Sequence, residues 1–277
     1  MKIAIAPNLV KKQAAARAEK AAAVLRKAGC QTVFITGLYQ KGSQRQKAVE
    51  QIGGCDLLLA LGGDGTIICA AKTAAGLDLP VLGVNAGKLG FNAGVEWEEI
   101  QLLARLAEAH WREERRMMLK VELVSGERRQ SFQALNDAVV SAELSTIIEY
   151  RMAIGSGLGY AYRADGFIIA TPTGSTAYSL SAGGPVIEPT LDCMIYTPIC
   201  PHSLFNRSVV FAPDTRLMVE IPKNRGRLFL TVDGEEPVEL QGNDRIIFEK
   251  SLRSARFIRL TENSFYDTLN HKLLEHQ

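Results

Sequence analysis

The segment Leu61-Gly62-Gly63-Asp64-Gly65-Thr66 places one carboxylate among three glycines, directly after the apolar run Leu57 to Leu61. Glycines let backbone N–H groups approach phosphate oxygens, and a helix that follows adds the partial positive charge of its N-terminus. An acid in such a loop suits chemistry beside a phosphate. The alternative is a tight turn in which Asp64 caps a helix. The loop by itself leaves both interpretations open.

Two polar segments in the second half of the chain have the composition of a nucleotide site. The pair Asn136-Asp137 lies in the apolar run Leu135 to Val140, where it either satisfies local backbone groups or faces a polar ligand such as a ribose. The block from Tyr162 to Pro189 combines hydroxyls, glycines, a charged pair and Tyr178. Hydroxyls and backbone groups suit a sugar and phosphates, and an aromatic ring suits a base. This composition favours binding over turn-building alone.

Other segments lack the residues or the spacing that known catalytic and nucleotide-binding motifs require. Gly87-Lys88 lacks the glycine spacing and the Ser/Thr of a Walker A loop. The glycine-rich segment 154–160 lacks G-x-G-x-x-G spacing and favours a hairpin. There is no G-x-S-x-G elbow and no H-E-x-x-H pair, and the four histidines are scattered. The simplest remaining chemistry uses a carboxylate as the base and a metal ion that the nucleotide supplies.

Charge and cysteine usage limit the partners and the compartment. A formal charge of +2 lacks the basic excess of a protein whose main partner is nucleic acid. The five cysteines form no C-x-x-C pair and lie mostly among apolar neighbours, as reduced cysteines do, so we expect a cytoplasmic protein. Neither a signal peptide nor an apolar run near 18 residues is present, so we expect no membrane partner.

Strands and helices alternate through about the first 95 residues, with strands predicted at 2–6, 31–36, 56–61 and 80–84 and helices at 11–28, 48–52 and 66–75. This order predicts a doubly wound, Rossmann-like α/β domain with a parallel sheet, in which ligands collect at the carboxyl ends of the strands. The Gly-Gly-Asp-Gly loop falls at such an end. Residues 97–114 are predicted to form an amphipathic helix, and the charged cluster Arg112 to Arg116 a solvated surface.

From Met117 onward the pattern changes to short β-rich runs, several of them alternating, bounded by Gly, Pro, Asn and Asp. It predicts an antiparallel β-sandwich or barrel. We expect three parts: an α/β domain over 1–115, a β-rich domain over 116–261, and a helical tail over 262–277 that packs back on the first domain.

Taken in order, these motifs resemble those of bacterial NAD kinases. The loop from Gly62 to Thr66 is also similar to loops of diacylglycerol kinases, sphingosine kinases and 6-phosphofructokinases, whereas the block from Thr171 to Pro185 is specific. Further similarity extends the resemblance over nearly the full chain, at Leu89-Gly90-Phe91, at 198–204 and at 265–269.

The resemblance implies an enzyme, a kinase that transfers the terminal phosphoryl group of ATP, or of polyphosphate, to the 2′-hydroxyl of the adenosine ribose of NAD, giving NADP. It implies that Asp64 is the general base, that Mg²⁺ or another divalent cation accompanies ATP, and that a homodimer or homotetramer completes the NAD site. The phosphate loop would consist of Gly62, Gly63, Gly65 and Thr66. NAD would be bound by residues of both domains, with the larger share from the β-rich domain: Asp64, Gly65, Phe91, Asn136, Asp137, Arg163, Asp165, Thr173, Thr176, Ala177, Tyr178 and Ser181.

The chain departs from the family pattern at four places. Asp137 stands where Glu is common, Asn92-Ala93-Gly94 replaces a Leu-Thr-Glu run, Phe205 replaces a small residue, and Glu235 replaces a frequent Gln. These changes bear on affinity, on donor choice and on the preference between NAD and NADH. Two rival functions remain: a lipid or sugar kinase with the same loop, and a non-catalytic NAD(H)-binding sensor.

Overall fold

The apolar run before the glycine-rich loop forms strand β3 (Leu57–Gly62), all of whose residues are buried. It pairs in parallel with β1 (Lys2–Pro7) on one side and with β4 (Pro80–Asn85) on the other, and β1 pairs with β2 (Gln31–Phe34). These strands therefore have the order β4-β3-β1-β2. A parallel strand covered on both faces needs apolar side chains throughout, which explains the uninterrupted run.

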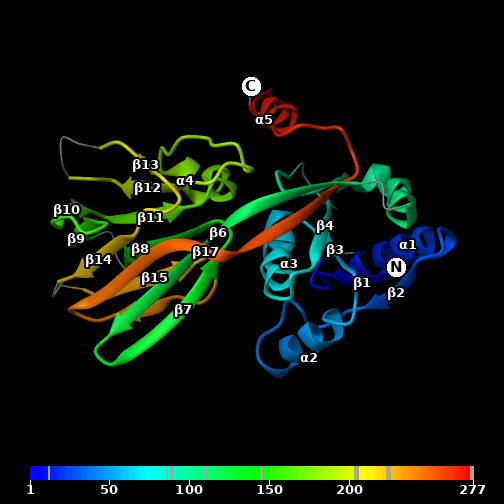
Figure 1. The fold of residues 1–277 in the computed structure, drawn as a ribbon, viewed down its shortest axis with the longest axis horizontal. Helices are drawn as coiled ribbons and strands as arrows, with labels where there is room; N and C mark the ends of the chain where they lie inside the picture. The colour runs from blue at the N-terminus through cyan, green and yellow to red at the C-terminus, as the bar shows by residue number, and fades with distance from the viewer. Residues whose placement is uncertain are drawn as a thin grey trace. The chain divides into compact units, whose positions relative to one another are not determined.

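The helices that connect these strands are α1 (Ala14–Lys27), α2 (Ser43–Ile52) and α3 (Asp64–Gly76), shown in Figure 1. α3 packs against β3 and β4. β5 (Val95–Glu96) adds a short parallel pairing to β4. The predicted doubly wound α/β fold is confirmed for this part of the chain.

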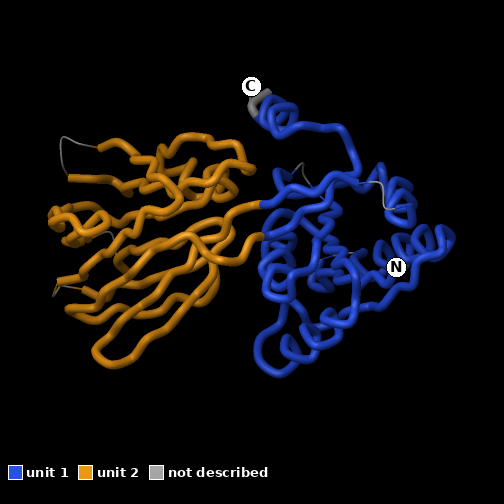
Figure 2. The backbone as a smooth tube through the Cα atoms, in the orientation of Figure 1, with its two compact units in different colours: residues 1–115, 255–277 blue, residues 116–254 orange. Residues whose placement is uncertain are grey.

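The chain divides into two compact units (Figure 2). Residues 1–115 and those from Ala255 on belong to unit 1, and residues 116–254 form unit 2. The computed structural model describes residues 1–11, 13–85, 87, 90–108, 111–143, 146–202, 206–222 and 226–274. Each unit has a hydrophobic core of its own. No helix within the described ranges is long and apolar enough to cross a membrane.

The prediction of one helix over 97–114 is wrong. A 3₁₀-helical segment η1 covers Trp97–Glu108, and strand β6 (Arg112–Ser125) begins within the predicted helix. The cluster Arg112 to Arg116 is a solvated surface only in part: Arg112 and Arg115 are exposed, but Arg116 is buried and Glu113 and Glu114 pair with arginines of β17 (Asp244–Arg259). Those long-range ion pairs hold the charged segment as a strand.

Unit 2 consists of two antiparallel sheets that enclose one core, so the predicted β-sandwich is confirmed. One sheet contains the unit 2 portions of β6 and β17 with β7 (Arg128–Ala134), β14 (Leu217–Ile221), β9 (Ile148–Ile154) and β10 (Tyr160–Ala164). The other has the order β13 (Val209–Phe211), β12 (Met194–Ile199), β11 (Gly166–Ala170), β8 (Asp137–Ala142), β15 (Leu228–Val232) and β16 (Val238–Leu240).

Aromatic residues fill the centre of the sandwich. Tyr150 and Phe167 are fully buried, with ring centroids 4.6 Å apart. The hydroxyls of Tyr150 and Tyr196 lie 2.6 Å from each other, so each polar tip has a partner inside the core. The predicted glycine-rich hairpin is also confirmed, since β9 and β10 pair antiparallel across residues 155–159.

The last helix, α5 (Phe265–Leu274), belongs to unit 1. The Phe265 ring lies 5.8 Å from the Phe91 ring, and the Lys272 ammonium lies 4.1 Å from the centre of the Phe91 ring. Ser264 starts the helix, because its hydroxyl accepts the Asp267 N–H while the Asp267 carboxylate accepts the Ser264 N–H. α5 therefore contacts the segment that follows β4.

Candidate functional site

The glycine-rich loop joins β3 directly to α3. Gly63 is the extended residue before the helix, and its carbonyl accepts the N–H groups of Thr66 and Ile67. A Cβ at Gly62 would lie 2.6 Å from the Thr66 hydroxyl, so packing requires glycine there. A Cβ at Gly65 would meet no atom of the described residues within 4 Å. The loop thus leaves open space beside Gly65, at the helix N-terminus where an anion is favoured.

Asp64 is the first residue of α3 and is not its cap, because Gly63 occupies the cap position. One oxygen of its carboxylate, Oδ2, accepts the Phe91 N–H at 3.1 Å, and the other, Oδ1, accepts the Asn92 N–H at 3.0 Å. These donors belong to the segment Gly90–Ala93, which we call the 90–93 loop. Hydrogen bonds to a carboxylate are short and directional, so the 90–93 loop orients Asp64. The interpretation of Asp64 as a helix cap is not supported.

Sequence reasoning missed two polar residues beside this loop. The Asn8 side-chain amide donates to the Thr66 hydroxyl at 3.1 Å, and the Lys11 ammonium lies 3.3 Å from the position of a Cβ at Gly63. Both follow β1, the parallel neighbour of β3. The sequence did contain a signal for them, because polar residues follow both β1 and β3. The carboxyl ends of neighbouring parallel strands meet at one edge of a sheet, so such residues are expected to lie close together.

A second carboxylate, also missed, lies in the electrostatic range of Asp64. Glu96 Oε2 accepts a hydrogen bond from the Asn85 amide at 2.7 Å, where β4 pairs with β5. Burial raises the pKa of Glu96, and the charges of Glu98, Glu99 and Asp64 raise it further, although the Asn85 hydrogen bond opposes the shift. Glu96 is therefore easier to protonate than an ordinary glutamate.

In unit 2, the Asn136-Asp137 pair is held by a carboxylate distant in sequence. Asp233 accepts the N–H groups of Leu135 and Asn136 at 2.8 Å and that of Asp137 at 3.0 Å. The Asp233 N–H returns a hydrogen bond to the Asp137 carbonyl at 2.9 Å. The Asp-Gly dipeptide at 233–234 signals a turn, but nothing in the sequence indicates which backbone the Asp233 carboxylate holds.

Backbone contact joins this pair to the hydroxyl-rich block. The Thr171 N–H donates to the Asn136 carbonyl at 2.8 Å, and the 3₁₀ turn η2 (Thr173–Thr176) follows immediately. A Cβ at Gly174 would lie 2.0 Å from that carbonyl, so only glycine permits the approach. Asn136 Oδ1 and Thr173 Oγ1 are buried without a hydrogen-bond partner among the described residues. Buried polar atoms require partners, so this junction suits a polar ligand.

In the hydroxyl-rich block from Tyr162 to Pro189, some hydroxyl side chains form hydrogen bonds within the protein and others are exposed. Ser175 exchanges hydrogen bonds with Ile187, and the Ser179 hydroxyl lies 3.0 Å from that of Thr197 in the interior. Tyr178, which begins the short helix α4 (Tyr178–Ser181), is instead 47% exposed. Of the other predicted residues, Thr176 ends η2, Ala177 joins η2 to α4, and Ser181 ends α4.

Arg163 and Asp165 lie on either side of Ala164, at the end of β10. The Arg163 guanidinium lies 3.3 Å from Glu149, and its carbonyl accepts the His202 N–H at 2.9 Å. The His202 Nε2 lies 3.8 Å from the Asp165 carboxylate. Arg163, Glu149 and His202 are exposed, so these charges are accessible.

Comparison with known proteins identifies the family. Residues 3–110 match the ATP-NAD kinase N-terminal domain, and residues 135–260 match the ATP-NAD kinase C-terminal domain. The NAD kinase of Symbiobacterium thermophilum is 42% identical over 224 residues, which span 80% of this chain and 79% of the relative. That of Magnetococcus marinus is 43% identical over 232 residues, spanning 82% of this chain and 76% of the relative. This chain belongs to the NAD kinase family.

Solved structures agree with this assignment. An NAD kinase from Archaeoglobus fulgidus in complex with ATP is similar with a TM-score of 0.75 and 26% identity, covering 99% of both chains. Yeast NADH kinase complexed with NADH shares the fold, with a TM-score of 0.81 at 22% identity over 99% of this chain and 87% of that one. The predictions of the NAD kinase family and of an enzyme of this class are confirmed.

The departures from the NAD kinase pattern have different structural settings. Asn92 and Ala93 lie in the 90–93 loop, where the Asn92 N–H donates to Asp64 and the Ala93 carbonyl accepts from Arg259, so these two contacts involve backbone atoms. Replacement of the usual side chains therefore leaves these contacts possible. Asp137 is buried at the start of β8. Phe205 lies outside the described residues.

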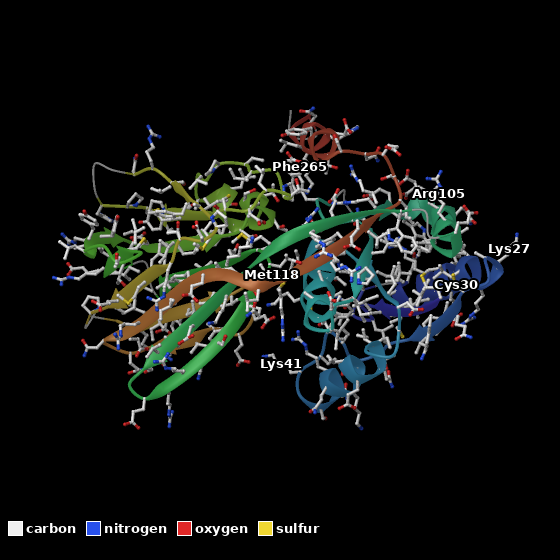
Figure 3. The ribbon with its side chains drawn as sticks, viewed as in Figure 1. Lys27, Cys30, Lys41, Arg105, Met118 and Phe265 are labelled. Atoms are coloured by element: carbon white, nitrogen blue, oxygen red, sulfur yellow. The ribbon has the colours of Figure 1, made fainter. Side chains whose placement is uncertain are left out.

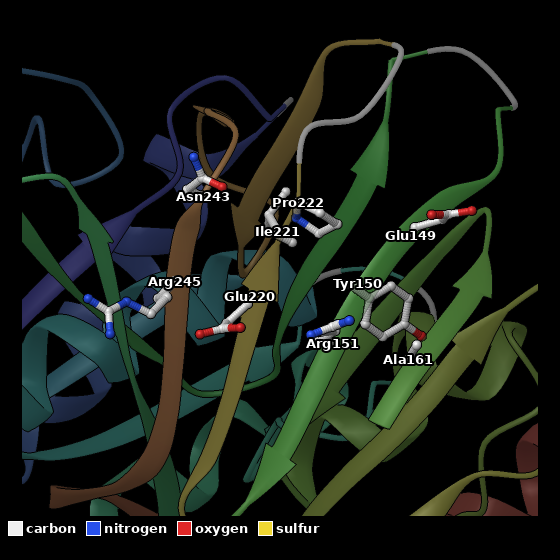
Figure 4. Close-up of a pocket in the computed structure, with 9 residues that line it drawn as sticks. All are labelled: Glu149, Tyr150, Arg151, Ala161, Glu220, Ile221, Pro222, Asn243 and Arg245. Carbon is white, nitrogen blue, oxygen red and sulfur yellow. The ribbon is translucent and has the colours of Figure 1, made fainter. Parts of the chain in front are cut away.

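A cavity of about 530 Å³ opens on unit 2 (Figure 4). Arg245, Glu220 and Arg151 stand in a row across three neighbouring strands, with Glu220 opposite both arginines in register. Opposite charges at such positions stabilise a sheet. None of the predicted site residues lines this cavity.

Proposed function

We propose that this NAD kinase transfers the terminal phosphoryl group of ATP to the 2′-hydroxyl of the adenosine ribose of NAD, with Asp64 as general base. The observation that carries the proposal is the Asp64 carboxylate, oriented by the N–H groups of Phe91 and Asn92 at the start of α3. A carboxylate held in this way is positioned in advance to receive a proton. The ATP complex of the similar Archaeoglobus kinase supports ATP as the donor.

In the proposed step, the 2′-oxygen forms a bond to the terminal phosphorus while the bond between that phosphorus and the bridging oxygen breaks, releasing ADP. The hydroxyl proton passes to Asp64. Phosphoryl transfer depends mainly on positioning and on electrostatic stabilisation. Backbone N–H groups at the α3 N-terminus and the Lys11 ammonium supply positive charge, and the open space at Gly65 lets phosphate oxygens approach.

We propose that the required Mg²⁺ arrives with the triphosphate. Mg²⁺ is usually bound through one or two carboxylates together with substrate phosphates, and Asp64 supplies a carboxylate beside the loop. Within the described ranges, no three His, Cys, Asp or Glu side chains group to hold a metal. The donor set therefore fits a shared ion, which would neutralise phosphate charge during transfer.

We further propose that the β-rich domain, 116–261, supplies most of the NAD-binding residues and that the α/β domain, 1–115, supplies the phosphate loop. The unpartnered Asn136 Oδ1 and Thr173 Oγ1 and the exposed Tyr178 ring support a polar and aromatic ligand there. Use of polyphosphate, a cytoplasmic location, and assembly into a homodimer or homotetramer belong to the same proposal.

The test is NADP formation by the purified protein from NAD and ATP, with NADH, diacylglycerol and fructose 6-phosphate as rival acceptors and polyphosphate as a rival donor. Asp64→Asn is expected to abolish NADP formation while NAD binding stays measurable by calorimetry. Asp78→Asn is the matched control, because Asp78 is an exposed acid of unit 1 with a φ of 52° that Asn tolerates. Near-normal turnover of Asp64→Asn would contradict the base assignment.

A further inference from the structure

Arg259, at the end of β17, contacts the same loop that orients Asp64. Its Nη1 donates to the Ala93 carbonyl, and its Nη2 donates to the Phe91 carbonyl at 3.4 Å. Its Nε donates to Glu114 Oε2 at 3.0 Å. One guanidinium therefore binds two carbonyls of the 90–93 loop and one carboxylate of β6.

The burial of Arg259 and Glu114 determines which partners the Arg259 guanidinium must have. The side chains of Arg259 and Glu114 are 12% and 15% exposed. A charge with so little exposure requires both a counter-ion and hydrogen-bond partners. Glu114 supplies the counter-ion, and the two loop carbonyls accept N–H groups that Glu114 leaves free. The planar fork of a guanidinium can serve all three acceptors at once.

The two faces of the 90–93 loop have different partners. The N–H groups of Phe91 and Asn92 point to Asp64, whereas the carbonyls of Phe91 and Ala93 point to Arg259. The Phe91 carbonyl and the Asn92 N–H belong to one planar peptide group. A donor that binds the carbonyl therefore sets the direction of the N–H on the opposite side, and it also polarises that group.

We propose that Arg259 is a positioning residue of the active site, which holds the 90–93 loop so that its N–H groups fix the Asp64 carboxylate. Arg259 acts through the loop and touches no reacting atom. The inference rests on the proposed role of Asp64 as base. It adds a residue 195 positions away from Asp64 to the machinery that determines kcat.

The alternative is that Arg259 only joins β17 to β6, and Arg256 provides the matched control. Arg256 lies on the same strand, makes a two-pronged pair with Glu113 at 2.8 Å on each side, and donates to the Asp78 carbonyl. Like Arg259, it pairs with a glutamate of β6 and donates to a backbone carbonyl of unit 1, but none of these contacts is to the 90–93 loop. A second control is Arg105, labelled in Figure 3, whose guanidinium donates to the Leu260 carbonyl.

The experiment compares Arg259→Gln, Arg259→Lys, Arg256→Gln and Arg105→Gln in NADP formation, with melting temperatures measured in parallel. Arg259→Gln is expected to lower kcat about 10- to 100-fold with the KM for NAD and ATP unchanged, because a catalytic group displaced by about 1 Å loses rate on that scale. Arg259→Lys should recover part of kcat, because it keeps the charge. The two controls should lose melting temperature but keep kcat.

Amide hydrogen exchange reports on the loop itself. The N–H groups of Phe91 and Asn92 should exchange faster in Arg259→Gln, while that of Ile35, which bonds to the Ile5 carbonyl at 2.8 Å, serves as the internal reference. The inference is overturned if kcat of Arg259→Gln stays within twofold of Arg256→Gln, or if exchange at Phe91 and Asn92 is unchanged. Failure of the base assignment is seen separately, as turnover by Asp64→Asn, and it would remove the catalytic part of the inference.

Discussion

Gly90 gives the sharpest test of where the Asp64 carboxylate must lie. A Cβ at position 90 would come within 2.5 Å of Asp64 Oδ1, 3.1 Å of Cγ and 3.3 Å of Oδ2. All three of the nearest atoms belong to the Asp64 carboxylate. The substitution Gly90→Ala therefore acts on the carboxylate rather than on the backbone.

The expected loss follows from these distances. Ordinary van der Waals contact begins at 3.4 Å, so Oδ1 must retreat from 2.5 Å by about 0.9 Å. Displacement of a catalytic group by about 1 Å costs about 100-fold in rate, or roughly 2.7 kcal/mol in activation free energy. Stability should change less, because the group that moves is the end of a side chain.

The assay is kcat for NADP formation at saturating NAD and ATP, with NAD affinity by calorimetry and the melting temperature as a check of folding. Gly87→Ala is the matched control, because a Cβ at Gly87 would contact no atom within 4 Å in the part of the chain that the structure describes. The reasoning is refuted if Gly90→Ala retains kcat within threefold of the wild type, or if Gly87→Ala loses as much.

Three further predictions concern binding and stability. Tyr178→Ala should raise the Kd for NAD, measured by calorimetry, about fivefold, since loss of an aromatic contact removes roughly 1 kcal/mol. Asp233→Asn should lower the free energy of unfolding in urea by about 1–3 kcal/mol, because one of its two oxygens no longer accepts a backbone N–H. Glu113→Gln should lower it by about 1–2 kcal/mol at pH 7. The Arg256 hydrogen bonds lower the pKa of Glu113, so its stabilisation exists above the unfolded pKa near 4.3 and disappears as pH falls through the folded pKa.

Each of these predictions has a definite contrary result. An unchanged Kd for Tyr178→Ala would remove the ring from the NAD site. If Asp233→Asn has the same midpoint of unfolding in urea as the wild type, solvent replaces the lost acceptor. For Glu113→Gln, the deficit should shrink as pH is lowered from 7 to 3. A deficit that is constant over this range would mean that packing, and not the ion pair, is responsible. Arg129→Ala, which breaks the exposed pair with Glu122, should leave stability unchanged.

Local pattern determined much of the fold. The apolar run Leu57 to Leu61 predicted a buried parallel strand because such strands are covered on both faces, and the glycines after it predicted a loop at the carboxyl end of the sheet. The period-two runs after Met117 predicted the sandwich for a different reason, because only one face of each of those strands is buried. The motif block from Thr171 to Pro185 carried the family assignment.

Tertiary structure alone decided how the site is held. The predicted helix over 97–114 ended early because Glu113 and Glu114 pair with arginines 143 and 145 residues away. Asp64 is oriented by N–H groups 27 and 28 residues on, and Asn136-Asp137 by a carboxylate about 97 residues on. Hydrogen bonds between residues that are distant in the sequence produce no periodic pattern and no bias in composition from which they could be predicted. The chain folds by burying apolar faces that the sequence displays, whereas the groups that orient Asp64 meet only after that burial has brought the strand ends together.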